Sequence, residues 1–472
     1  MAYAAWKGGL AGREAVFHLS FRKNPFGGGF AVAAGLEDAV DHVLHQRLGP
    51  EDLAFLAAQV GNDGRTLFDP AFLDWLAALP MDVDVDAVPE GTAVFPHEPL
   101  VRVRGPVVPC MLLESPLLAI VNFQTLVATK AARLVLAAQG DPVIEFGLRR
   151  AQGIDGALAA SRAAWVGGVA GTSNVLAARL YGIPVKGTHA HSWVMLFRDE
   201  LEAFLAYAEA LPANAVLLVD TYDSLEGVRR AAEVGRRLRD RGHRLAGIRL
   251  DSGDLAWLSQ RAREILDAAG LEDAAILASN ELDEEIVQSL KAEQGAAIGA
   301  WGVGTRLVTG WGEPALGGVY KLSAVRDGPG APWRPCVKLS EQAAKVSIPG
   351  TLQVRRYEHP GGFLADVVWD EGTGLPPAPE MVDPLDPTRR RVIPAGTPGA
   401  DLLVPVVRRG AAAGELPELE ASRARAREQL GRLHAGIKRF VHPHQYPVGL
   451  ERGLHELRTR LVLEARGARS AT

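Results

Sequence analysis

The fold is decided by the run from residue 215 to residue 254, which reads AVLLVDTYDSLEGVRRAAEVGRRLRDRGHRLAGIRLDSGD. It opens with an apolar strand candidate at residues 215–220 and closes with another at residues 245–250. A charged stretch suited to a helix lies between them, and a polar turn follows each strand. Strand, helix and strand in this order predict a βαβ unit with parallel strands.

The same rhythm continues on both sides of this run. The strand candidates are residues 143–146, 183–187, 215–220, 245–250, 274–278 and 296–302. Their spacing is that of successive βα units, so a parallel sheet is the simplest arrangement. Six units, with another one or two expected, favour an irregular α/β barrel over a small doubly wound sheet.

The flanking segments do not show this alternation of strands and helices. A chain of 472 residues is also too long for one ordinary hydrophobic core. Residues 1–138 mix strands with helices, the last of which is a long apolar helix at 112–137. Later expectations are hairpin strands at 353–357 and 363–369, a surface loop at 376–391, and amphipathic helices at 415–440 and 450–465. We predict a barrel domain at 139–322, inserted into an α/β sandwich domain that residues 1–138 and 323–472 form together.

Composition excludes several classes of protein. Hydrophobic residues make up 47% and charged residues 23%, which is typical of a globular protein and not of a disordered one. The net charge of -5 gives no reason to expect nucleic-acid binding. The two cysteines, Cys110 and Cys336, exclude a disulfide scaffold and a thiolate zinc site. Without a signal peptide or an apolar run of transmembrane length, we expect a cytoplasmic protein with no membrane span.

Polar residues gather directly after the predicted strands. These segments are residues 145–150, 187–192, 220–223, 249–254, 279–281 and 302–305. The C-terminal ends of parallel strands meet on one face of an α/β barrel, where such folds place their active sites. We therefore predict an active site on strand ends between Glu145 and Thr305.

Two kinds of group in these segments suit anions. The runs Gly302-Val-Gly-Thr305 and Ser252-Gly253 let backbone N–H groups approach a phosphate closely, although a tight turn without a ligand has the same composition. Arg149 and Arg150 offer bidentate clamps for phosphate or carboxylate, or else form a solvated pair at a helix start.

Four acidic residues follow the strands. Asp220, Asp223, Asp251 and Asp254 could hold Mg²⁺ through oxygen ligands or accept hydrogen bonds from ribose hydroxyls. Helix N-capping is the alternative, above all for Asp254.

Two histidines stand one residue apart. His189 and His191 could form an H-x-H metal pair, but no third nitrogen or sulfur ligand lies nearby in the sequence. A neutral imidazole among phosphate-binding turns can also act as a nucleophile towards a phosphoryl group. No Walker A loop, completed Rossmann fingerprint or G-x-S-x-G elbow is present.

Taken together, these segments resemble the nicotinate phosphoribosyltransferase family. The matching runs are EFGLRRAQG at 145–153, GTSN at 171–174, GTHAHSW at 187–193, DTYD at 220–223, RLDSGD at 249–254, SN at 279–280 and GVGT at 302–305. The runs FRKNPFGGG at 21–29 and LGGVYK at 316–321 extend the resemblance over nearly the whole chain.

The resemblance implies an activity and an assembly. The reaction joins nicotinate to phosphoribosyl pyrophosphate, giving nicotinate mononucleotide and pyrophosphate in NAD biosynthesis, with hydrolysis of ATP and with Mg²⁺. The fold is that of type II phosphoribosyltransferases, an irregular α/β barrel beside an α/β sandwich, acting as a homodimer with shared sites. Relatives carry a Thr-Asp-Leu-Tyr-Gln segment before the position of Met1, and its tyrosine stacks on nicotinate.

The resemblance also assigns residues. It implies that His191 is a phosphorylated histidine. We also expect Asp251 to be a catalytic group, and Asp220 and Asp251 are the candidates for holding Mg²⁺. The substrate-binding residues expected from it are Thr188, Arg249, Arg149, Ser192, Thr305, Gly304, Ser252, Gly253 and Asn280.

Three alternatives remain. A sister enzyme could use nicotinamide or quinolinate on the same fold, although Arg249 favours a carboxylate substrate. A non-catalytic homologue could bind nucleotides or a partner. An unrelated barrel enzyme, such as an isomerase, could act on phosphosugars.

Overall fold

The computed structural model describes residues 1–342 and 345–467. The chain divides into two compact units: a sandwich unit, made of Met1–Thr125 and Ala315–Thr472, and a barrel unit, Leu126–Pro314. The first division falls inside one continuous helix, α6 (Glu114–Ala138). The bounds drawn from the sequence, 1–138, 139–322 and 323–472, stay a prediction.

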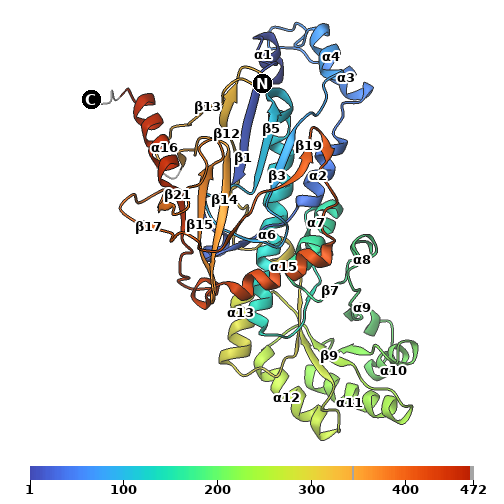
Figure 1. The fold of residues 1–472 in the computed structure, drawn as a ribbon. Helices are drawn as coiled ribbons and strands as arrows, with labels where there is room; N and C mark the ends of the chain where they lie inside the picture. Colours follow the sequence, from blue (N-terminus) through green and yellow to red (C-terminus); the bar gives the residue numbers. More distant parts are fainter. Residues whose placement is uncertain (343–344, 468–472) are drawn as a thin grey trace. The chain divides into compact units, whose positions relative to one another are not determined.

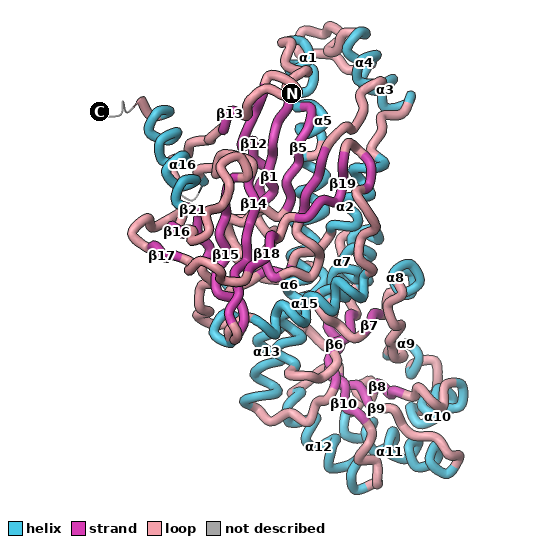
Figure 2. The backbone as a smooth tube through the Cα atoms, in the orientation of Figure 1, coloured by secondary structure: helices cyan, strands magenta, loops and turns pink. Residues whose placement is uncertain are grey.

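The barrel unit is built on a six-stranded sheet in which every pairing is parallel. In sheet order the strands are β7 (Gly171–Thr172), β6 (Val143–Glu145), β11 (Ala300–Val303), β10 (Ala275–Ala278), β9 (Gly247–Leu250) and β8 (Val216–Leu218). The sheet curls but its end strands, β7 and β8, are not paired with each other (Figure 2). The predicted α/β fold with an irregular barrel is confirmed.

One predicted strand of this sheet was wrong. Residues 183–187 form no strand, and Val185 makes only an isolated bridge to Thr172. Pro184 has no N–H and cannot donate to a ladder, so a longer pairing is blocked. Val185 therefore lies beside β7, the edge strand of the sheet, which at two residues is too short to show a periodic pattern.

Helices cover the barrel sheet. They are α7 (Gly153–Val166), α8 (Val175–Tyr181), α9 (His191–Val194), α10 (Glu200–Ala210), α11 (Ser224–Asp240), α12 (Leu255–Ala268), α13 (Glu284–Gln288) and α14 (Thr305–Val308). Of these, α11 and α12 pack on β9, and α10 lies beside α11 (Figure 1). The first turn of α12 is fixed by the Asp254 carboxylate, which accepts from Trp257 N–H at 3.0 Å.

The sandwich unit holds two larger sheets and a short two-stranded one. The first, wholly antiparallel, has the order β13 (Arg334–Pro335), β12 (Val319–Arg326), β1 (Glu14–Ser20), β5 (Val101–Pro106), β3 (Asp84–Ala87), β19 (Val404–Arg408) and β20 (Ala411–Ala412). The second has the order β17 (Arg390–Val392), β16 (Glu380–Val382), β21 (Val448–Glu451), β15 (Gly362–Asp370), β14 (Leu352–His359) and β18 (Gly399–Asp401). The short one pairs β2 (Ala31–Val32) with β4 (Ala93–Val94).

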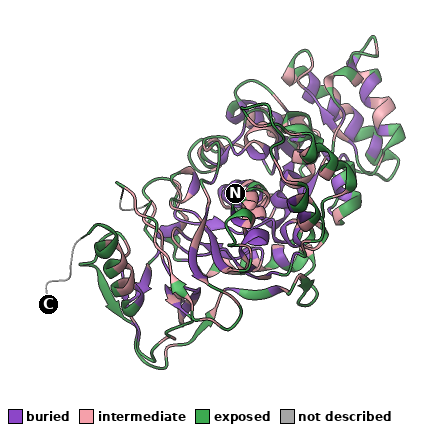
Figure 3. Ribbon diagram, turned by 90° about the horizontal axis from the view of Figure 1, so that it is seen from above, coloured by how far each residue is buried: buried purple, intermediate pink, exposed green. Residues whose placement is uncertain are grey.

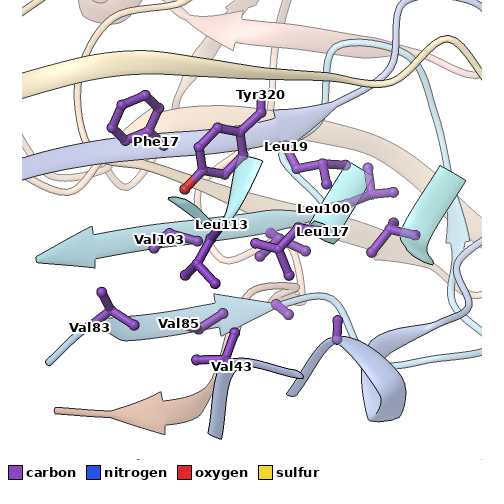
Figure 4. Packing of buried hydrophobic residues seen from close by; sticks show 14 of the residues in the cluster. Phe17, Leu19, Val43, Val83, Val85, Leu100, Val103, Leu113, Leu117 and Tyr320 are labelled. Carbon is purple, nitrogen blue, oxygen red and sulfur yellow. The ribbon is translucent and has the colours of Figure 1, made fainter. Parts of the chain in front are cut away.

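The remaining helices belong to the same unit. They are α1 (Ala2–Lys7), α2 (Leu36–His45), α3 (Pro50–Ala57), α4 (Pro70–Ala77), α5 (Val107–Leu112), α15 (Leu419–Arg432) and α16 (Arg452–Ala465). Apolar side chains of the first sheet pack against α2, α5 and the start of α6 (Figure 4). At the centre, the rings of Phe17 and Tyr320 stack at 4.8 Å, and the Tyr320 hydroxyl donates to the Cys110 carbonyl at 3.0 Å.

Two expectations for the C-terminal part need correction. The predicted loop at 376–391 contains β16 and the start of β17. Each strand has only three residues and lies among prolines, so the sequence shows no strand pattern there. The helix predicted at 415–440 is shorter: α15 ends at Arg432, and a 3-10 turn follows at Ala435–Lys438.

One helix, α6, is long and apolar enough to cross a membrane by length and composition alone. However, 67% of its apolar window is buried inside the protein, as in a core helix. Buried residues in general line the sheets and the inward faces of the helices (Figure 3).

Candidate active site

The predicted site residues lie where the barrel strands end. Because the sheet is parallel, the segments after β6, β11, β10, β9 and β8 follow one another along the same edge. The side chains described below come from these segments and from the stretch that leads into α9.

Arg249, on β9, is held by three side chains. Its Nε donates to Ser279 Oγ at 2.7 Å, its Nη1 to Thr188 Oγ1 at 3.0 Å, and its Nη2 to Asp251 Oδ1 at 2.8 Å. The Ser279 hydroxyl in turn donates to Asp251 Oδ1. With the side chain 13% exposed, these partners fix the direction of the guanidinium fork.

Two carboxylates and a histidine lie next to this arginine. Asp220 Oδ2 accepts from the Asp251 N–H at 2.9 Å and from Ser252 Oγ at 2.6 Å. His191 is the first residue of α9, and its Nε2 lies 4.0 Å from Asp220 Oδ1 and 3.8 Å from Asp251 Oδ2. Its Nδ1 is 3.1 Å from Thr221 Oγ1.

Asp220 Oδ1 is buried and has no hydrogen-bond partner among the residues that the structure describes. Such an atom is costly to leave unpaired, which makes it a place for a cation or a donor group of a ligand. No group of three or more His, Cys, Asp or Glu that could hold a metal occurs in the described part of the chain.

The two histidines of the H-x-H pair have different surroundings. His189 is buried: its Nε2 accepts from the Leu218 N–H at 3.1 Å, and its ring packs against Phe204 and Tyr207. Burial lowers the pKa of this imidazole, so it is a neutral structural group. Only His191 faces the carboxylates.

An aromatic ring lies next to the arginine. The ring centroid of Phe146 lies 5.4 Å from the Arg249 guanidinium carbon. Gly302 makes room for this ring, because a Cβ at that position would lie 2.7 Å from Phe146 Cε2. The ring and the guanidinium together offer a flat apolar surface beside a positive charge.

The turns that were expected to bind phosphate lie at the same edge. Gly304 and Thr305 lead from β11 into the four-residue helix α14. Ser252 and Gly253 form the turn after β9, with Gly253 at φ 79°, and Asn280 follows β10 at φ 97°. Gly253 adopts its positive φ without steric cost, and Asn280 is a residue type that tolerates one, so both are suited to turns.

The other predicted residues make no hydrogen bond or ion pair with Arg249, Asp251 or His191 within residues 1–342 and 345–467. Asp223 and Asp254 cap helices α11 and α12 through Glu226 N–H and Trp257 N–H, as the alternative interpretation expected. Arg149 is exposed in the 3-10 turn after β6, and Ser192 is exposed on α9. Arg149 makes no ion pair in the described part of the chain.

A buried polar network supports the turn after β6. Both oxygens of Glu145 are used, since Oε1 accepts from the Gly147 N–H while Oε2 accepts from Ser161 Oγ at 2.9 Å and Thr172 Oγ1 at 2.5 Å. The Asn174 N–H donates to Thr172 Oγ1 at 2.9 Å. Glu145 thus holds the turn that carries Phe146 and Arg149.

The sandwich unit contains a basic cavity of about 700 Å³. Its cationic lining comes from two segments, namely Arg22 and Lys23 near the N-terminus and the run Arg389, Arg390 and Arg391. Such a cavity suits a polyanion.

Sequence reasoning missed roles for several of these residues. Phe146 and Ser279 stood inside the quoted runs but received no role, because ring stacking and arginine orientation depend on which strands are neighbours. The basic cavity has a visible signal, the triple arginine at 389–391, but only the fold brings it near residue 22.

Comparison with known proteins identifies the family. Family profiles match in three parts: the nicotinate phosphoribosyltransferase (NAPRTase) N-terminal domain at residues 1–122, the NAPRTase family at 142–327, and the C-terminal domain at 353–458. A nicotinate phosphoribosyltransferase of Bacillus subtilis is 38% identical, covering 98% of this chain and 95% of that protein. The human enzyme of that name is 37% identical, covering 97% and 94%.

Solved structures agree with these sequence relationships. The crystal structure of human nicotinic acid phosphoribosyltransferase superposes with a TM-score of 0.84 at 35% identity, covering 98% of both chains. A nicotinate-nucleotide pyrophosphorylase of Pyrococcus furiosus, at TM-score 0.68 and 22% identity over 91% of this chain, shares the fold. This chain therefore belongs to the nicotinate phosphoribosyltransferase family.

Proposed function

We propose that the protein transfers the phosphoribosyl group of phosphoribosyl pyrophosphate to nicotinate, releasing nicotinate mononucleotide and pyrophosphate in NAD salvage. The observation that carries the proposal is Arg249, oriented by Thr188, Ser279 and Asp251 beside the ring of Phe146. A pyridine carboxylate has the two features that this arrangement recognises, an aromatic face and a planar anion.

The same arginine gives the preference for nicotinate over nicotinamide. A neutral amide would leave the largely buried guanidinium without a new counter-charge. Because Asp251 already pairs with Arg249, the acid gains one additional charge-assisted hydrogen bond, worth about 1.5–3 kcal/mol, which favours it by roughly ten- to a hundredfold.

In the transfer, the pyridine nitrogen attacks the anomeric carbon of the donor. The bond from that carbon to the pyrophosphate oxygen breaks, and its electron pair leaves with pyrophosphate. The turns at Gly304–Thr305 and Ser252–Gly253 hold the phosphates of the donor through N–H groups. Asn280 and Arg149 bind the substrates at the same edge of the sheet. The protein thereby orients the reactants and stabilises the departing charge.

Asp220 and Asp251 fit a magnesium ion that arrives with the donor. Mg²⁺ is usually bound by one or two carboxylates together with substrate phosphate oxygens, and Asp220 Oδ1 lacks a hydrogen-bond partner among the described residues. Bound there, the ion would neutralise charge on the pyrophosphate. Asp251 also keeps Arg249 in place, so its removal affects both substrates.

The histidine that reacts with ATP is His191. When Nδ1–H donates to Thr221 Oγ1, Nε2 keeps its lone pair and attacks the γ-phosphorus of ATP, so ADP leaves with the electrons of the broken P–O bond. Water later cleaves the P–N bond and releases phosphate. The phosphohistidine adds about two negative charges next to Asp220 and Asp251, and we propose that this repulsion couples ATP hydrolysis to turnover. Ser192, exposed on the same helix, contacts the phosphoryl group.

The working form is a homodimer with shared sites. Exposed apolar side chains follow one another on α8, before α9 and directly after α9: Val175, Leu180, Val185, Met195 and Leu196, each more than half exposed. Apolar surface of this kind is usually covered by a partner. The unpaired cysteines, Cys110 and Cys336, agree with a reducing cytoplasm.

The test is product formation from nicotinate, phosphoribosyl pyrophosphate, Mg²⁺ and ATP. We expect nicotinate mononucleotide from the parent protein, with nicotinamide consumed at least tenfold more slowly than nicotinate and quinolinate assayed in parallel. His191→Ala should lose the stimulation by ATP, whereas His243→Ala, at an exposed histidine, should keep it. Absence of product from nicotinate under these conditions would overturn the proposal.

A further inference from the structure

His191, the histidine of the proposed reaction with ATP, lies on a helix that has little stability of its own. α9 has only four residues, and Ala190 at its N-cap has no side-chain oxygen to accept from the first N–H groups. Isolated helices are marginal below about 12–15 residues, so contacts outside α9 must hold it in place. Its position matters because the His191 side chain, 42% exposed, has to meet Thr221 and the carboxylates of Asp220 and Asp251.

The first anchor is His189, which pairs with the open edge of the barrel sheet. β8 is an end strand of that sheet, and its continuation at Val219 donates an N–H to the Arg249 carbonyl of β9 at 3.2 Å. Successive N–H groups of a strand point to opposite sides, so the Leu218 N–H points away from β9, to the edge without a neighbouring strand. His189 Nε2 accepts from this N–H at 3.1 Å. The histidine thus ties the entry of α9 to the strand that leads into Asp220.

Both ring nitrogens of His189 are used. Nδ1 lies 3.3 Å from the Ala190 carbonyl oxygen, to which it donates when Nε2 accepts. The residue is 7% exposed, and burial lowers the pKa of the ring, which keeps it in the neutral form that this arrangement needs. An apolar side chain of similar size would leave the buried Leu218 N–H without an acceptor, which is costly.

The second anchor is Trp193, within α9 itself. Its Nε1 donates to the Ala203 carbonyl oxygen of α10 at 3.0 Å, and its ring packs edge-on against Tyr207, with the ring centroids 6.2 Å apart. The same Tyr207 ring meets His189 edge-on at 4.8 Å. One ring of α10 therefore supports both anchors, which stand two residues before and two residues after His191.

We propose that His189 and Trp193 are positioning residues for the phosphorylation of His191. The proposal rests on the proposed function, in which His191 Nε2 attacks the γ-phosphorus of ATP, the bond from that phosphorus to the bridging oxygen breaks, and ADP leaves with its electron pair. The attack needs the Nε2 lone pair in line with the bond that breaks. The hydrogen bond between Nδ1 and Thr221 sets the rotation of the ring, whereas the two anchors set the backbone that carries it. A misplacement of about 1 Å at a reacting group can cost about a hundredfold in rate.

The rate of phosphohistidine formation in the full-length protein, with ATP labelled in the γ-phosphate, tests both anchors. His189→Leu should lower the rate constant about ten- to a hundredfold, and His189→Gln, whose amide oxygen can accept from the Leu218 N–H, should recover most of it. Trp193→Phe keeps a ring but loses one neutral hydrogen bond, so a loss of about three- to tenfold is expected. Trp301→Phe is the matched control in the barrel unit, because it loses an indole hydrogen bond to Asp141 of 3.1 Å and should keep the parental rate constant.

Rate constant and amplitude of the time course separate positioning from loss of folded protein. A misplaced histidine reacts slowly in every molecule, which lowers the rate constant. A variant that is only unstable has fewer reactive molecules, which lowers the amplitude at an unchanged rate constant. That second result for His189→Leu and Trp193→Phe, or equal rate constants for His189→Leu and His189→Gln, would overturn the proposal.

Crystal structures of the parent and the His189→Leu protein give an answer that does not depend on ATP. In the variant, His191 Nδ1 should lie beyond hydrogen-bond distance of Thr221 Oγ1, against 3.1 Å with the anchor in place. Should His189→Leu not fold, Trp193→Phe provides the same comparison. An unmoved His191 would contradict the positioning role. If the parent protein forms no phosphohistidine, the ATP step of the proposed function fails instead, and the crystal structures alone decide on the anchors.

Discussion

Arg249 and Asp251, two residues apart at the end of β9, are joined by a hydrogen bond of 2.8 Å and share Ser279 as a partner. The serine hydroxyl accepts from the guanidinium and donates to the carboxylate, so it sets the direction of both groups. The pair is therefore assembled before any substrate binds.

Ser279→Ala tests this arrangement. Loss of a hydrogen bond to a charged group costs about 1.5–3 kcal/mol, so the KM for nicotinate should rise roughly ten- to a hundredfold. Steady-state kinetics with each substrate varied in turn will measure it. Ser259→Ala removes an equally buried serine on α12 and should leave the KM for nicotinate unchanged. Equal effects of the two variants would mean that Ser279 acts only through stability.

Gly302→Ala should displace the ring beside the arginine. The added Cβ would lie 2.7 Å from Phe146 Cε2, closer than carbon atoms approach without a shift. We expect a weaker affinity for nicotinate, by about tenfold, measured by equilibrium dialysis. Gly299→Ala is the matched control, since a Cβ there meets nothing within 4 Å. Unchanged binding in Gly302→Ala would show that the ring is not part of the site.

A buried ion pair in the sandwich unit should dominate a stability measurement. Arg356, 2% exposed, donates to Asp366, which is fully buried and also accepts from the Tyr446 hydroxyl at 2.8 Å. Arg356→Met leaves that carboxylate without its cation and should lower the free energy of unfolding by about 3–5 kcal/mol in urea titrations. Arg237→Met breaks an exposed helix pair and should cost less than about 1 kcal/mol. Similar losses from both substitutions would contradict the expectation.

The pH dependence of stability should carry a contribution from His97. Burial, with Arg458 next in effect, lowers the pKa of this imidazole to about 4 from 6.5. The unfolded chain therefore binds a proton that the folded chain refuses, and stability falls as the pH drops from 6.5 towards 4. His97→Asn should flatten that fall in unfolding free energies measured between these pH values. Asparagine tolerates the positive φ of 73° at this position, so strain does not confuse the comparison. Parallel curves for the two proteins would contradict the assignment.

The parallel barrel could be predicted from sequence because its strands are short apolar runs, each followed by a polar turn. Five of the six predicted strands are present. The sixth, at 183–187, has the same apolar pattern, but Pro184 prevents a ladder. The short strands β16 and β17 were missed because three residues flanked by prolines are too few to show an alternating apolar and polar pattern.

The sequence predicted those site residues that come directly after a strand, because polar residues at these positions can be recognised without the structure. His191, Asp220, Arg249 and Asp251 do come together. What the sequence cannot express is which of several similar residues faces inward. His189 carries the same side chain as His191 but is used to pair the Leu218 N–H. The role of Ser279 depends on β10 lying beside β9, a pairing between residues about thirty positions apart.

The pairing of β1 with β12 has a consequence for how the chain folds during synthesis. Glu14 and Arg326 are ion-paired partners 312 residues apart, and all of the barrel unit is synthesised between them. Until the second strand leaves the ribosome, β1 can pair only with β5, so one edge of an apolar strand stays open. Nascent chains that end within the barrel would expose this edge, and they are the form of the protein with the strongest need for a chaperone.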